Sequence, residues 1–247
     1  MIDDRQLTVV LGRFAGLAAH VVEDPVAWLG TERPAGPVAE RGALGRLRRA
    51  GAGVRHLLVG RMHPGAPGWD QVPVQDRCQW WVRRIAAVTA PIAATPRIAG
   101  ALGGRVPVQA ALGAAAAGLA VCAIAREHGL EQPEDWVPLL SRVLFGRDVS
   151  RPAQVPPAPE VEPDADLARG RVPAPPGIPR RAVTGLWRLA GVLWALPSLF
   201  DERPRGWLLW RAVGTLPLVG LPAGVLDERG AIRRAAQQSR ELLLTRR

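Results

Sequence analysis

The sequence contains no lysine, no asparagine and no tyrosine, so arginine supplies every basic side chain apart from four histidines. Without lysine, the chain cannot form a Schiff base or complete a phosphate-binding P-loop. Ala, Gly, Pro and Arg are abundant, as in a GC-rich coding sequence, and the formal net charge is +10. Since such a composition already favours arginine over lysine, the presence of arginine alone does not indicate bidentate recognition of an anion.

Cysteine is also scarce. Cys78 and Cys122 lie far apart, which leaves one disulfide possible but excludes a disulfide framework. The histidines show no metal-binding spacing, and neither a nucleophile elbow nor a dinucleotide-binding glycine motif occurs. We therefore expect no metal, no cofactor and no catalytic residue, and we favour a protein without enzymatic activity. An active site assembled from distant residues remains an open alternative.

Charge is absent from one long stretch, residues 106–125, in which nine of twenty residues are alanine. Twenty helical residues span about 30 Å, enough to cross a bilayer, but alanine contributes little to membrane insertion. Two interpretations follow for this segment. It is either the buried central helix of a helical protein, or a membrane-embedded span or re-entrant hairpin.

Hydrophobic periodicity predicts an all-α protein. We expect helices over residues 3–22, 38–62, 70–94, 106–128, 182–200 and 227–245, with a short helix that begins near Glu134 and Asp135. Gly129 is expected to stop the central helix. The predicted fold is a helical bundle around an Ala-rich central helical hairpin, residues 85–125. The region 1–149 contains this hairpin, 150–181 is a Pro-rich disordered linker, and 182–247 packs back on the first region to give one domain.

Small residues on the apolar segments indicate close helix packing. Small residues recur four positions apart in the central segment, and GxxxG occurs within the second apolar segment, residues 207–226. Arg211 interrupts that second segment, and Pro217 and Pro222 are expected to bend it. The predicted helix-packing residues are Gly113, Ala117, Gly118, Gly220 and Gly224.

Tryptophan and arginine pairs lie beside the first apolar run, as at a membrane interface, although large rings at a helix end also pack in ordinary cores. On the last helix, arginines share one face and form either a solvated surface or a contact for anionic lipid. The predicted contacts with a membrane or an anionic partner are Trp80, Trp81, Arg83, Arg84, Arg229, Arg233 and Arg240.

Three stretches resemble the bacterial EcsC-like family. They are IAAVTAPIAATPRIAG (85–100), IAREHGLEQPEDW (124–136) and LPLVGLPAGVLDERGAIRRAAQQS (216–239). The resemblance covers roughly residues 80–247 without the linker. It implies a helical, membrane-associated protein, in a family named after a gene beside an ABC transporter linked to secretion. It supplies no catalytic residues, and the Pro-rich insertion and Arg211 depart from the pattern.

We expect a non-enzymatic membrane-associated helical protein, accessory to transport or secretion, on the cytoplasmic side of the cell membrane. No cleavable signal peptide is expected, because the acidic start is not followed by a short apolar segment. The expected partner is an anionic membrane surface or a membrane protein. The alternative is a cytoplasmic helical enzyme or small-molecule-binding protein with a buried Ala-rich core. Nucleic acid is disfavoured, because the arginines are spread over several helices and mixed with acids.

Overall fold

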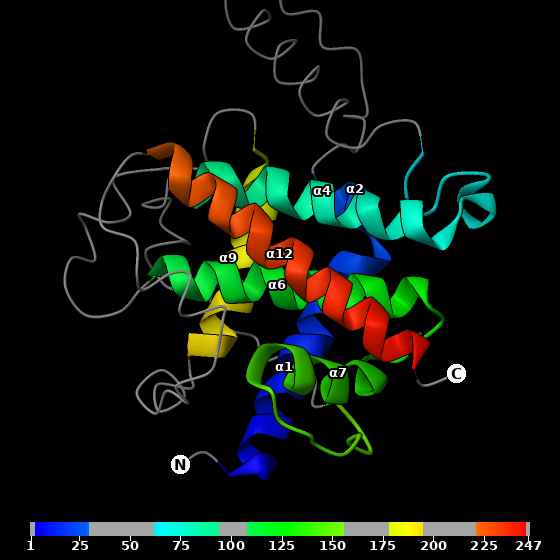
Figure 1. The fold of residues 1–247 in the computed structure, drawn as a ribbon, viewed down its shortest axis with the longest axis vertical. Coiled ribbons are helices and arrows are strands. Elements are labelled where there is room, and N and C mark those ends of the chain that lie inside the picture. Colours follow the sequence, from blue (N-terminus) through cyan, green and yellow to red (C-terminus); the bar gives the residue numbers. More distant parts are fainter. Residues whose placement is uncertain (1–2, 30–61, 94–107, 156–177, 195–220, 246–247) are drawn as a thin grey trace, which may run out of the picture.

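The computed structural model describes residues 3–29, 62–93, 108–155, 178–194 and 221–245, and of 93, 108–110, 194 and 221–229 it describes the backbone alone (Figure 1). All regular elements in these ranges are helices, as predicted. They are α1 (Asp4–Glu23), α2 (Pro25–Trp28), a 3₁₀ turn η1 (Trp69–Gln71), α4 (Val74–Ala93), α6 (Val108–Glu127), α7 (Pro133–Phe145), α9 (Arg180–Trp194) and α12 (Leu221–Leu244). The predicted helix over 38–62, apart from its last residue, and the connection between the two helices of the predicted hairpin lie outside the described residues.

Helix α6 is the centre of the bundle. It packs against α1, α4, α7, α9 and α12, and residues 115–125 are all buried (Figure 1). Large side chains from the surrounding helices, among them Phe14, Trp81 and Trp136, complete the same core. The Ala-rich segment is therefore enclosed by protein on all sides along these residues, as the first of the two interpretations expected. The packing of α4 on α6 gives the predicted pair of helices.

The end of α6 is set by a glycine. Gly129 has a φ of +92°, a left-handed conformation that favours glycine. Its N–H donates to the carbonyl of Arg126 (2.9 Å), and the N–H of Leu130 donates to the carbonyl of Ala125 (3.0 Å). These two bonds form the Schellman arrangement. Gly129 thus ends the helix as predicted and fixes the position of Glu127 in the last turn.

The predicted small-residue contacts are only partly found. A Cβ at Gly118 would lie 2.7 Å from Cζ of Phe14, so α1 approaches α6 at a point that excludes a side chain. Ala117 is fully buried, whereas a Cβ at Gly113 would meet nothing within 4 Å. Gly113 is therefore not a packing residue in the described bundle. Gly220 lies outside the described residues, and no side-chain packing is described around Gly224.

Two predicted helix starts need correction. Helix α4 begins at Val74 instead of Asp70, because Pro73 holds the preceding Val72 in an extended conformation (φ −71°, ψ 134°). Helix α12 begins at Leu221, six residues before Asp227. Pro222 therefore lies in the first turn of α12, where the missing N–H of proline costs no helical hydrogen bond.

Both ends of the predicted disordered linker, residues 150–181, belong to the described residues and contact or continue the bundle. Arg151 is paired with Asp135 of α7, and the N–H of Val155 donates to Oε1 of Glu134 (3.2 Å). The acidic first turn of α7 thus holds residues 150–155 against the bundle as an ordered strap. At the other end α9 already begins at Arg180. The prediction for 156–177 falls on residues outside the description.

Within the described residues, no helix combines the length and the apolar character needed to cross a bilayer.

Candidate functional site

One end of α6 carries a buried carboxylate whose partners come from separate elements. The side chain of Glu127 is 7 % exposed, and its Oε2 lies 2.9 Å from Nη1 of Arg77 on α4. Its Oε1 accepts hydrogen bonds from the indole N–H groups of Trp81 (2.9 Å) and Trp69 (3.3 Å). We call Trp69, Arg77, Trp81 and Glu127 the Glu127 cluster. With both oxygens engaged and little solvent access, this cluster fixes the loop before α4 onto the bundle.

Trp80 extends the cluster towards the surface. Its ring meets Trp69 edge to face at 5.7 Å and Trp81 at 5.1 Å, both typical aromatic geometries. The guanidinium carbon of Arg84 lies 5.6 Å from the centre of the Trp80 ring, within cation–π range. Burial lowers the pKa of Arg84, and the neighbouring positive charge of Arg83 lowers it further to a smaller extent. Arg84 therefore serves the packing of these rings and is half-buried against them.

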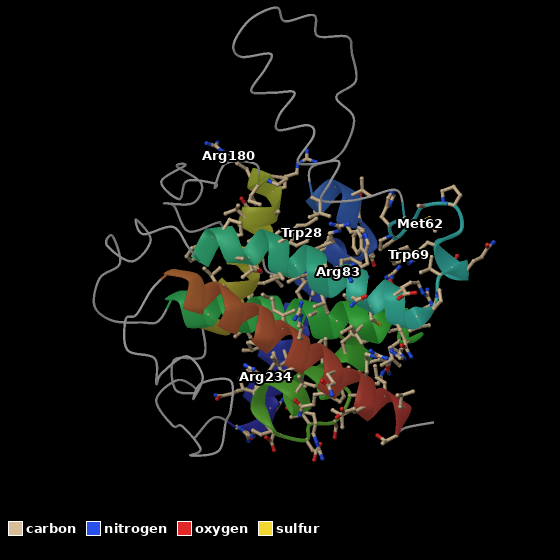
Figure 2. The ribbon with its side chains drawn as sticks, turned by 45° about the horizontal axis from the view of Figure 1, so that its top comes forward. Trp28, Met62, Trp69, Arg83, Arg180 and Arg234 are labelled. Atoms are coloured by element: carbon tan, nitrogen blue, oxygen red, sulfur yellow. The ribbon has the colours of Figure 1, made fainter. Side chains whose placement is uncertain are left out.

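The second site is an open groove of about 550 Å³ between α4 and α12. Arginines from both helices line the groove, together with the buried side chains of Cys78 and Ala236. The lining residues are Gln75, Asp76, Cys78, Gln79, Val82 and Arg83 from α4, and Arg233, Ala236, Gln237, Arg240, Glu241 and Leu244 from α12. Figure 2 shows Arg83 on α4, and shows Trp69 on the segment that precedes this helix. We call this site the α4–α12 groove.

The groove arginines lack ion-pair partners among the described residues. Arg77, Arg142, Arg147 and Arg151 each pair with a carboxylate elsewhere in the bundle. No carboxylate of the described ranges makes such a contact with Arg83, Arg233 or Arg240. Glu241, although close by, accepts a hydrogen bond from Nε2 of Gln237 (3.1 Å). The positive charge of the groove is therefore left available to an external anion.

Cys78 lies between the two sites. It is 2 % exposed on the floor of the groove, and burial raises its pKa to about 11. The negative charge of Glu127 raises this pKa further, whereas Arg240 and Arg77 lower it. Cys122, in the middle of α6, has its pKa raised by complete burial. Both cysteines are free thiols in the structure, and both are protonated at neutral pH, so neither has the character of a nucleophile.

The six predicted contact residues whose side chains are described divide into three groups. Arg83, Arg233 and Arg240 meet in the groove, although they come from segments 150 residues apart in the chain. Trp80 and Arg84 stack on each other beside it. Trp81 is 1 % exposed and donates to Glu127, so it is a core residue, which corrects its expected surface role. The side chain of Arg229 lies outside the description.

Sequence analysis did not identify Glu127, Arg77 or Trp69. One signal was available for two members of the cluster: Arg77 and Trp81 are four positions apart and so share one face of α4. A second signal was the position of Glu127 immediately after a long apolar segment, where a carboxylate close to the core needs a partner. The contribution of Trp69, 58 residues from Glu127 along the chain, had no local signal.

In the described ranges, no three His, Cys, Asp or Glu residues are grouped so that they could hold a metal ion. Comparison with known proteins found no family model, no curated protein and no solved structure that matches the chain. The resemblance to EcsC-like proteins therefore remains a prediction that rests on the three stretches quoted above.

Proposed function

We propose that the protein is a non-enzymatic helical protein that binds the anionic cytoplasmic surface of the cell membrane peripherally, through the α4–α12 groove. The observation that carries this proposal is the convergence of Arg83, Arg233 and Arg240 on one surface without carboxylate partners among the described residues. Basic residues near an anionic leaflet each contribute about 1 kcal/mol to binding.

The peripheral mode is favoured over embedding of the central hairpin. Residues 115–125 of α6 are buried by other helices and have no face left for lipid. The EcsC-like resemblance implies an accessory role in transport or secretion, and we propose that the α4–α12 groove serves this role. In that role the groove would hold the helical bundle on the membrane, beside a membrane protein of the transport or secretion system.

The test is co-sedimentation with vesicles of phosphatidylcholine, with and without phosphatidylglycerol. We expect association only with the anionic vesicles, and we expect added salt to weaken it by screening. Replacing both Arg233 and Arg240 by Gln removes about 2 kcal/mol of attraction, which corresponds to roughly a thirtyfold weaker partition.

A matched control is the pair Arg13→Gln and Arg188→Gln, which removes the same charge from exposed positions on α1 and α9. If this control pair weakened binding as strongly as the groove pair, the attraction would come from overall charge and the groove would have no special role. Equal association with neutral vesicles would also contradict the proposal.

A further inference from the structure

The α4–α12 groove has the size of a site for one small molecule. Its volume of about 550 Å³ is within the usual range of ligand pockets, and its floor is closed by the buried Cys78 and Ala236. A diffuse electrostatic surface needs no such hollow. The groove therefore suits the insertion of a single group of the ligand between the two helices.

The charges of the groove are separated along its length. Helices α4 and α12 run in roughly opposite directions, since α12 starts beside the end of α4 and runs back diagonally (Figure 1). Arg83, late in the lining part of α4, thus lies towards Arg233, early in that of α12, while Asp76 lies towards Glu241 and Leu244. Arg240 is close enough to Cys78 to lower the pKa of its thiol. The Arg83–Arg233 end of the groove therefore has no carboxylate in its lining, whereas Asp76 and Glu241 lie with Arg240 towards the other end.

We propose that this groove binds one phosphomonoester head group that carries an apolar chain, with the phosphate at the Arg83–Arg233 end. A phosphomonoester carries about −1.5 to −2 charges and three acceptor oxygens, which match several guanidinium groups. The chain would lie over Val82 and Ala236 towards Leu244, whose side chain is 60 % exposed. This inference rests on the proposed function, because the head group is that of a membrane lipid.

The test is calorimetric titration of the full chain with monomeric dioctanoyl phosphatidic acid, beside dioctanoyl phosphatidylcholine and inorganic phosphate. We expect saturable binding of one phosphatidic acid per chain, weaker binding of phosphate and no binding of phosphatidylcholine. Replacing Arg83 or Arg233 by Gln should weaken binding about tenfold, as expected for the loss of a charge-assisted hydrogen bond.

Arg234→Gln is the matched control, because Arg234 is an exposed neighbour of Arg233 on α12 that does not line the groove. Equal weakening by Arg234→Gln, or equal affinity for phosphate and phosphatidic acid, would overturn this inference. Vesicle association without saturable binding of the monomeric lipid would overturn it and leave the proposed function intact. Saturable binding of the monomeric lipid without vesicle association would overturn the proposed function and leave the binding of the phosphomonoester intact.

Discussion

The Glu127 cluster and the α4–α12 groove use the same helix for opposite purposes. Arg77 and Arg83 are six residues apart on α4, yet Arg77 is 16 % exposed and bound to Glu127, whereas Arg83 is exposed and has no carboxylate partner among the described residues. At about 100° per residue, six positions turn the side chain to a different face of the helix. The comparison teaches that an arginine in this protein acquires its role from the face it occupies.

The largest effect on stability is expected from disrupting the Glu127 cluster. Glu127→Gln keeps the size of the side chain but places an amide beside the largely buried guanidinium of Arg77, whose remaining carboxylate neighbour is the solvent-exposed Asp70 at 3.9 Å. We expect a loss of about 3 kcal/mol in the free energy of unfolding, measured by urea denaturation. Asp70→Asn is the matched control, because Asp70 is 99 % exposed and 3.9 Å from the same arginine. Similar small losses in both variants would contradict a structural role for the cluster.

The next effect concerns Cys78, which joins the two sites. Its pKa is raised from 9.0 to about 11 in the folded protein, so the folded state holds this proton at a pH at which the unfolded state has lost it. Stability should therefore fall as the pH rises from 9 to 11, by at most about 1.4 kcal/mol per pH unit for the Cys78 thiol. Lysine and tyrosine, which normally titrate in this range, are absent.

Thermal unfolding between pH 9 and pH 11 measures this loss. The variant with Cys78→Ala and Cys122→Ala should lose most of the pH dependence, and each single variant should lose part of it. A slope that persists in the double variant would mean that another group titrates and that the thiols do not control stability in this range.

The smallest effect on stability is expected in the α4–α12 groove. Arg83, Arg233 and Arg240 make no ion pair with described residues, so replacing all three by Gln should change the free energy of unfolding by no more than about 0.5 kcal/mol. Urea denaturation measures this directly beside Glu127→Gln. A stabilisation, from relief of repulsion among the three arginines, would sharpen the contrast, whereas a loss comparable to that of Glu127→Gln would erase it.

Local patterns predicted some elements well. The amphipathic period placed α1 within one residue of its observed bounds, and Gly129 marked the end of α6. Prediction was weaker where proline decided a boundary: Pro73 delays the start of α4, while Pro222 lies within the first turn of α12. Proline is compatible with both a break and a first helical turn, and its neighbours in the folded chain decide between the two.

The candidate site was half predictable. Arg83, Arg233 and Arg240 were identified from charge and position, and their meeting in one groove depends on the packing of α4 and α12 in roughly opposite directions. Trp81 was assigned to the surface because its neighbour pattern resembles an interfacial one. Its burial follows from the partner it finds in Glu127, which lies 46 residues away in the sequence.

The sequence by itself determined the helical class, the glycine that ends the Ala-rich segment, and a basic charge made only of arginine, because these depend on local spacing and on side-chain chemistry. It left two interpretations for the Ala-rich segment, and the packing of the surrounding helices decided for burial by protein. Only the tertiary structure decided which arginines are neutralised and which stay open. That choice depends on which helix face meets Glu127 and which face borders α12, and packing between distant segments sets both.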